Sequence, residues 1–160
     1  MSNIVQILKG LELDESVLSK TKPERLIEGT RQAGNLLFVS GHGPTDENGE
    51  MAFLGRVGTD LTLEEAREAA QLCTLGCLGA IKKALGSLMR IDRIIRLRGF
   101  VNSADSFHDQ PEVMNAASEL LLGVFGDAGR HVRTALGTSV LPGNIPVEID
   151  MVVALKPQDT

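Results

Sequence analysis

One arginine and two carboxylates near the C-terminus have the residue types and spacing of a site for anion binding or acid–base chemistry. Glu148 and Asp150 alternate with apolar residues, so a strand here places both carboxylates on one face. Burying a carboxylate is costly unless a cation compensates it. Arg133, on the preceding strand-like segment, is a natural partner because its guanidinium fork matches a carboxylate. Two interpretations stay open: Arg133 forms a structural ion pair with Glu148, or it binds a ligand carboxylate.

The elements that must position these groups can be read from turn and capping signals. Thr62 and Glu65 match a capping box and predict a helix over 62–85, with Gly86 as its stop. Pro111 opens a second helix that ends at 126–129. Strands are predicted at 26–28, 36–39 (with a loop from Ser40), 51–54, 91–101, 132–141 and 146–155.

The predicted order is therefore β-β-β-α-β-α-β-β. It indicates an α+β fold in which a mixed six-stranded sheet carries two helices on one face. The other face needs a cover, because a bare apolar sheet face is an exposed patch. We expect that cover to be another copy of the chain.

Composition excludes several functional classes. The chain of 160 residues has a net charge of −5, no Trp, no Tyr and five Phe, which argues against nucleic acid as a partner. No apolar run is long enough to cross a membrane, and the N-terminus lacks a signal-peptide pattern, so we expect a cytoplasmic protein without a membrane partner. Cys73 and Cys77 are read as buried small hydrophobes. The cysteines and three scattered histidines show no metal-ligand spacing, and no metal or cofactor is expected.

Three segments together resemble a known family. The run from Arg133 to Pro142 (RTALGTSVLP), the later segment Val147-Glu148-Ile149-Asp150, and the run from Gly34 to Gly41 (GNLLFVSG) are similar to the signatures of the RidA (YjgF) family of reactive-intermediate deaminases, also labelled endoribonuclease L-PSP. Asn115 sits where that family has a Val-Asn pair. The resemblance covers roughly residues 24–156. It predicts a single domain over 24–160 behind an N-terminal extension at 1–23.

The resemblance implies a chorismate-mutase-like fold that assembles as a homotrimer, with ligand sites in clefts between subunits. It implies that Arg133 binds the carboxylate of an enamine or imine such as 2-aminoacrylate, helped by the backbone at Gly41. Glu148 would orient or activate the water that adds to the imine carbon, so that a 2-oxo acid and ammonia leave. The remaining expected substrate-binding residues are Ser40, His42, Asn115 and Ala135.

The chain departs from the family pattern at several positions, which indicates a divergent branch. Ile27 stands where the family has a tyrosine, and Ala135 stands where it has a cysteine. His42 is either a loop histidine or a pocket donor that replaces lost groups, and His131 is read as a loop residue. Two alternatives to a deaminase remain: a non-catalytic protein that binds small carboxylates in the same cleft, and, less favoured by the acidic composition, an endoribonuclease.

Overall fold

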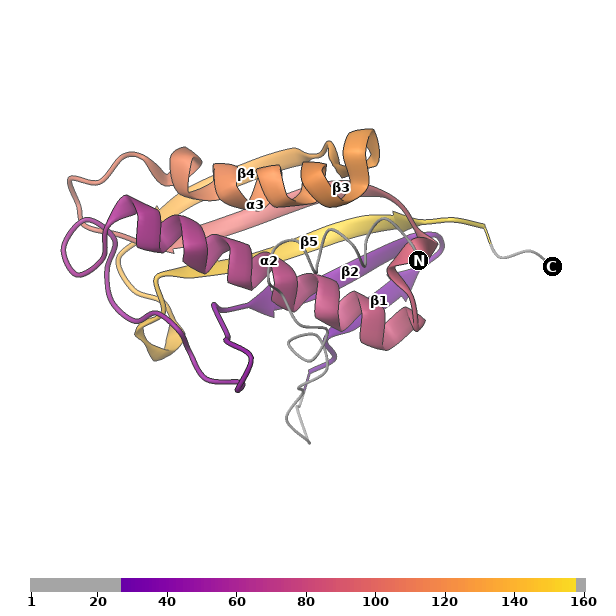
Figure 1. Cartoon of the computed structure of the whole chain (residues 1–160), viewed down its shortest axis with the longest axis horizontal. Helices are drawn as coiled ribbons and strands as arrows, with labels where there is room; N and C mark the ends of the chain where they lie inside the picture. Colours follow the sequence, from indigo (N-terminus) through magenta and orange to yellow (C-terminus); the bar gives the residue numbers. More distant parts are fainter. Residues whose placement is uncertain (1–26, 158–160) are drawn as a thin grey trace.

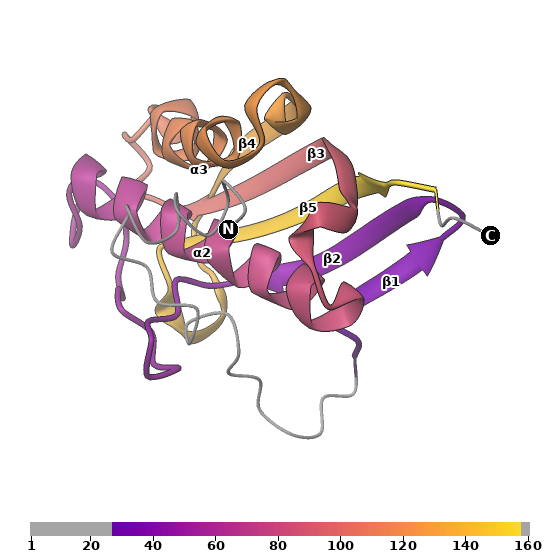
Figure 2. The same ribbon diagram turned by 45° about the vertical axis from the view of Figure 1, so that its right-hand side comes forward.

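The structure, a computed structural model, describes residues 27–157. In this part of the chain five strands form one mixed sheet in the order β1-β2-β5-β3-β4, and two long helices pack on one side of it (Figure 1; Figure 2). The fold class and the two helices agree with the sequence prediction. The elements in chain order are β1 (Thr30–Ala33), β2 (Leu36–His42), α2 (Leu63–Leu85), β3 (Ile91–Asn102), α3 (Gln110–Phe125), β4 (Val132–Thr138) and β5 (Val147–Leu155), with short 3₁₀ helices at Leu88–Arg90, Gly126–Gly129 and Pro142–Asn144.

The predicted strand count of six is wrong, because the described residues form five. Segment 51–54 contributes only an isolated bridge between Met51 and Thr45. The first strand is also misplaced, since β1 begins at Thr30 rather than within 26–28, of which residue 26 lies outside the described range. The tight turn at Gly34 and Asn35 explains this position, because Ala33 and Leu36 on either side of the turn pair with each other. Gly34 has the positive φ of 61° that such turns need. The predicted extension at 1–23 lies outside the described residues.

Both helices begin and end where their capping residues predicted. The Thr62 side chain accepts a hydrogen bond from the Glu65 backbone, and the Glu65 carboxylate accepts one from the Thr62 backbone, which completes the capping box of α2. Gly86 ends α2 in the left-handed conformation at φ 75°. Pro111 lies in the first turn of α3, where its missing N–H costs nothing.

The face of α2 that meets the sheet consists of small residues. Its buried positions include Ala66, Ala69 and Ala70, which lets the helix approach the strands closely. Cys73 and Cys77 are fully buried there, as the sequence predicted, and their thiols donate to the carbonyl oxygens of Val147 and Ile149 on β5, each at 3.3 Å. Burial raises the pKa of both thiols above the ordinary range.

Strand β5 occupies the middle of the sheet, between β2 and β3, and is antiparallel to both. Strand β4 pairs only with β3, in parallel, and α3 provides the crossover between them. The last two strands in sequence are therefore not neighbours in space, because β3 separates them. This arrangement leaves β4 at one edge of the sheet.

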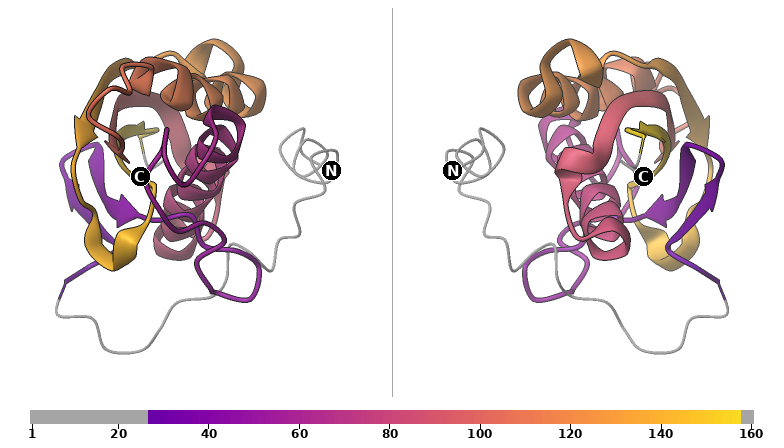
Figure 3. Two further views of the ribbon diagram at one scale, coloured as in Figure 1. Left: turned by 90° about the vertical axis from the view of Figure 1, so that its left-hand side faces the viewer. Right: turned by 90° about the vertical axis from the view of Figure 1, so that its right-hand side faces the viewer.

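The helices cover only one face of the sheet, as the end-on views in Figure 3 show. On the opposite face, which we call the open face, side chains alternate with those of the core. Phe38 on β2 and Leu136 on β4 point outward here and are 43% and 51% exposed. The expectation of one bare sheet face therefore agrees with the described residues.

Substitution of two glycines near the end of α3 tests the packing, because a Cβ fits at one position and collides at the other. A Cβ at Gly129 would collide with the backbone carbonyl of Leu121, whereas a Cβ at Gly123 would meet nothing within 4 Å. Gly129→Ala should therefore lower the free energy of unfolding by roughly 1–3 kcal/mol. Gly123→Ala, in the helix interior, should raise it by about 0.5–1 kcal/mol. Urea denaturation at one protein concentration measures both, and equal effects of the two substitutions would contradict this packing.

Candidate functional site

Arg133 lies on the edge strand β4 and points to the helix side of the sheet. Its Nη1 donates to Asn115 Oδ1 and to Ser118 Oγ, each at 3.0 Å, and its Nη2 donates to the carbonyl oxygen of Pro111 at 3.3 Å. All three partners belong to α3, whose residues 115 and 118 share one face because they are three apart. The helix therefore fixes the direction of the guanidinium.

The partners of Arg133 are neutral. No described acid lies within salt-bridge distance of its guanidinium. No described residue accepts from its Nε–H or from its second Nη2–H, and neither nitrogen counts among the buried unpaired atoms. Arg133 therefore keeps its positive charge uncompensated by described residues and retains two donors of the kind that a carboxylate binds.

Two other predicted site residues lie on the same side of the sheet as Arg133. Asn115 contacts the arginine directly, and its amide nitrogen donates to Glu112 Oε2 at 3.1 Å, which orients the amide oxygen toward the guanidinium. Ala135 follows two positions after Arg133 on β4 and packs against the core. The structure thus brings together the α3 and β4 members of the predicted site.

Glu148 does not belong to this group, and the proposed ion pair between Arg133 and Glu148 does not form within one chain. Glu148 pairs across the sheet with Phe100 on β3, so β3 lies between it and β4. Its side chain also points to the open face, opposite to Arg133. The short connection between the last two strands suggested adjacency, but strand order decides the contact.

Gly41 accompanies Glu148 on the open face. A Cβ at position 41 would collide with the Glu148 carboxylate, so the glycine makes room for that group. The preceding Ser40 donates from its hydroxyl to the carbonyl oxygen of Glu28 at 2.6 Å. The loop predicted from Ser40 is wrong: β2 continues to His42, with a register shift between Val39 and His42. That irregularity lets Gly41 face the Glu148 carboxylate.

His42 lies on the helix side of β2. Its Nδ1 is 2.7 Å from the Ser40 carbonyl oxygen and 3.7 Å from Cys77 Sγ, and its ring packs against Gly76 of α2. The histidine is part-buried between strand and helix. The structure therefore does not place His42 beside Glu148, which points the other way. Ile27, at the position of the family tyrosine, precedes β1 and is 65% exposed.

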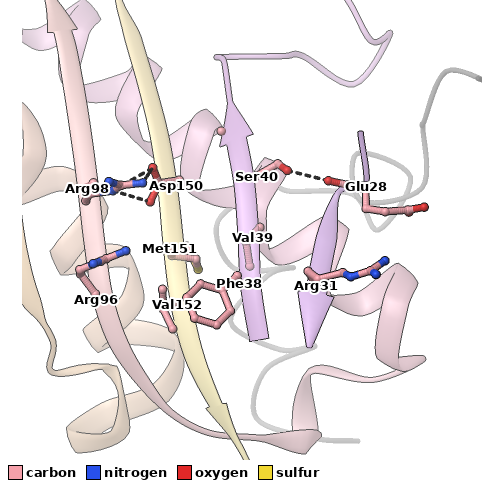
Figure 4. A pocket seen from close by; sticks show the side chains of 11 residues that line it. Glu28, Arg31, Phe38, Val39, Ser40, Arg96, Arg98, Asp150, Met151 and Val152 are labelled. Atoms are coloured by element: carbon pink, nitrogen blue, oxygen red, sulfur yellow. Dashed lines mark hydrogen bonds and ion pairs between the residues drawn. The ribbon is translucent and has the colours of Figure 1, made fainter. Parts of the chain in front are cut away.

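A hollow of about 270 Å³ lies on the open face next to Ser40 and Gly41. Figure 4 shows Arg98 directed at Asp150, with the Phe38 ring beside Val152. Arg98 Nε donates to both Asp150 oxygens at 3.0 and 3.1 Å, and Nη2 lies 2.8 Å from Oδ2. These bonds raise the pKa of Arg98.

Sequence spacing did not predict this ion pair. Its signal in the sequence was the presence of Arg96 and Arg98 two positions apart on β3 and of Glu148 and Asp150 two positions apart on β5.

Two residues beside Arg133 were not identified as part of a site. His131 Nε2 lies 3.0 Å from Ser118 Oγ, and His131 Nδ1 lies 2.7 Å from the Gly129 carbonyl oxygen. The sequence suggested that His131 was only a loop residue, and a single serine in an amphipathic helix carries no signal. Only the spacing related Ser118 to the predicted site, because Ser118 follows Asn115 by three positions and therefore shares its helix face.

Sites of two other kinds are absent from the part of the chain that the structure describes. Among residues 27–157, no group of three or more His, Cys, Asp or Glu side chains could hold a metal ion. Within the same residues, every helix is too short or too polar to cross a membrane.

Comparison with known proteins gives a consistent family. Residues 4–154 match the model of the family described as "YjgF/chorismate_mutase-like, putative endoribonuclease". Protein TCP17 from Trypanosoma cruzi is 42% identical over 124 residues, which is 77% of each chain.

Two solved structures are similar throughout. Protein Atu1372 from Agrobacterium tumefaciens, of unknown function, has a TM-score of 0.86 at 40% identity, over 96% of this chain and 94% of its own. A protein from Shewanella oneidensis described as a "putative endoribonuclease" has a TM-score of 0.88 at 31% identity, over 96% of this chain and 100% of its own. With its fold, its C-terminal signature and these matches in agreement, the chain belongs to the YjgF/chorismate mutase-like family, the RidA family that its sequence resembles.

Proposed function

We propose that the protein hydrolyses reactive enamines and imines of the 2-aminoacrylate type, with the substrate carboxylate bound by Arg133. Water adds to the imine carbon, the carbon–nitrogen bond then breaks, and a 2-oxo acid and ammonia leave. The family resemblance supplies this reaction class. The observation that supports this reaction for this chain is the environment of Arg133, whose guanidinium is held at the sheet edge by neutral hydrogen-bond acceptors.

The neutral acceptors matter because they leave the guanidinium with its charge available to bind a ligand carboxylate. An acid in their place would neutralise the guanidinium, and a ligand would then have to displace it. Asn115 and Ser118 instead hold Arg133 in one orientation without cancelling its charge. A carboxylate that approaches the remaining donors gains charge-assisted hydrogen bonds and pays little for ordering the side chain.

A complete site needs two copies of the chain. Arg133 faces the helix side at one sheet edge, whereas Gly41 and Glu148 lie on the open face across β2 and β5. The open face has exposed apolar side chains such as Phe38 that another copy would cover. We propose a homotrimer in which Arg133 of one copy and Glu148 of the next share each cleft.

In such a cleft the residues divide the work. Arg133 fixes the carboxylate and thereby places the imine carbon, which contributes orientation. Glu148 accepts a proton from the attacking water, and the amine takes up a proton before it leaves as ammonia. Gly41 keeps the Glu148 carboxylate accessible, because any larger residue there would displace it.

One observation favours a second candidate, a protein that binds small carboxylates without turning them over. Among the described residues of a single chain, Arg133 has neutral hydrogen-bond partners but no carboxylate within ion-pair distance. The binding function needs only the α3 and β4 half of the site. Catalysis in addition to binding therefore depends on the assembly.

Removing the guanidinium tests the site itself. Arg133→Ala should lower kcat/KM for 2-oxo acid release by about 10²-fold or more, because the carboxylate loses its charge-assisted bonds. The assay couples a 2-aminoacrylate-generating dehydratase to detection of pyruvate. Arg133→Lys should recover only part of the rate, since an ammonium lacks the planar fork.

The matched control is Arg93→Ala, an exposed arginine of β3 that pairs with Asp92 at 2.9 Å. It should leave the rate unchanged. No acceleration by the wild-type protein would reject the deaminase function. Calorimetry with 2-oxobutyrate would then decide whether the binding function holds, with Arg133→Ala expected to abolish binding.

Mixing two inactive variants tests the shared cleft. Arg133→Ala and Glu148→Gln should each be inactive alone. After denaturation and joint refolding at equal amounts, roughly one cleft in four should combine an intact Arg133 with an intact Glu148 and regain activity. Light scattering should give the mass of three chains. A mixture that stays inactive although it has assembled would show that the two residues do not act across one interface.

A further inference from the structure

We propose that His131 is a positioning residue for Arg133, which acts through Ser118 and couples carboxylate binding to the uptake of a proton. The inference rests on the proposed function in one respect, because it takes a ligand carboxylate to bind at Arg133. It adds a residue that neither the sequence nor the family match assigns to the site.

The directions of the hydrogen bonds around His131 follow from the chemistry of the partners. The Gly129 carbonyl oxygen can only accept, so at 2.7 Å it requires the hydrogen on His131 Nδ1. In a neutral imidazole Nε2 is then an acceptor, and it takes the hydroxyl hydrogen of Ser118 at 3.0 Å. The Ser118 oxygen is left to accept from Arg133 Nη1, also at 3.0 Å.

Arg133 thus lies at the centre of a chain of hydrogen bonds with defined directions. On one side Ser118 accepts from it because His131 holds the hydroxyl hydrogen. On the other side the Asn115 amide oxygen accepts from Arg133, because the amide nitrogen donates to Glu112 Oε2 at 3.1 Å. Both Nη1 hydrogens are therefore directed into the protein, and the guanidinium turns its remaining donors to a ligand.

A proton on His131 changes this arrangement. Nε2 then donates to Ser118, the Ser118 oxygen accepts from both His131 and Arg133, and the hydroxyl hydrogen is free to turn toward an anion. The imidazolium also adds a positive charge two hydrogen bonds from Arg133. A bound carboxylate attracts that charge, so binding and protonation favour each other.

The charged groups of α3 and of the turn before His131 have partners of their own. On α3, Glu119 is held by Arg67 at 3.0 Å, and Glu112 accepts from the Asn115 amide. On the turn before His131, Asp127 pairs with Arg130 at 3.1 Å. On β3, Arg96 lies opposite Val132 but lines the hollow on the open face, away from the helix side where Ser118 meets His131. Arg133 is therefore the charged group joined to His131 through a single residue, Ser118.

Calorimetry with 2-oxobutyrate as the probe tests the coupling. Titrations at pH 6.5 in two buffers of different ionisation enthalpy should show net proton uptake by the wild-type protein on binding. Its affinity should fall roughly tenfold as pH rises through the range in which histidines lose their charge. His131→Gln should still bind the probe but without proton uptake and with little dependence on pH. Ser118→Ala should weaken binding and reduce the uptake.

The matched control is His108→Gln, an exposed histidine outside the site, which should behave as the wild type does. Circular dichroism and the melting temperature establish that each variant is folded. Binding by the wild type without proton uptake, or undiminished uptake by His131→Gln, overturns this inference and leaves the proposed function standing. No binding of the probe at any pH overturns both.

Discussion

The constraint on which the site depends is the pairing of β3 with both β4 and β5. This pairing places β5 in the middle of the sheet and moves β4 to an edge. Arg133 and Glu148, on consecutive strands in the sequence, are thereby separated by a strand and point to opposite faces. Direct pairing of β4 with β5 would place the strands of the two charges side by side within one chain.

The neutral hydrogen-bond acceptors of Arg133 fix its orientation and leave its charge available. Three bonds from α3 order the Arg133 side chain, so the protein bears the entropic cost of fixing a long flexible side chain before any ligand arrives. None of these bonds cancels its charge. On the open face the opposite solution appears, where Arg98 and Asp150 satisfy each other and contribute little net charge. Arg133 is thus available to bind a ligand, whereas Arg98 neutralises a neighbouring carboxylate.

Short sequence motifs predicted the features that depend on neighbouring residues, such as the ends of the helices. The capping box at Thr62, the glycine at 86 and the proline at 111 set helix ends through a few neighbouring bonds, and these ends were confirmed. Strand order could not be predicted in this way, because it depends on pairing between segments far apart in the chain. That is why an Arg133–Glu148 pair was one of the two interpretations of the sequence, whereas the Arg98–Asp150 pair was not predicted. The proximity of Ser118 to His131 likewise depends on how α3 packs against β4.

The two buried thiols have a practical consequence for the strand that bears Glu148. Cys73 and Cys77 donate to the carbonyl oxygens of Val147 and Ile149, the residues that flank Glu148. A sulfinate in place of either thiol would present acceptor oxygens to a carbonyl and would need room that the interface between α2 and β5 lacks. Both thiols are buried and burial raises their pKa, so they are poor targets for oxidation and continue to support the strand from the helix side.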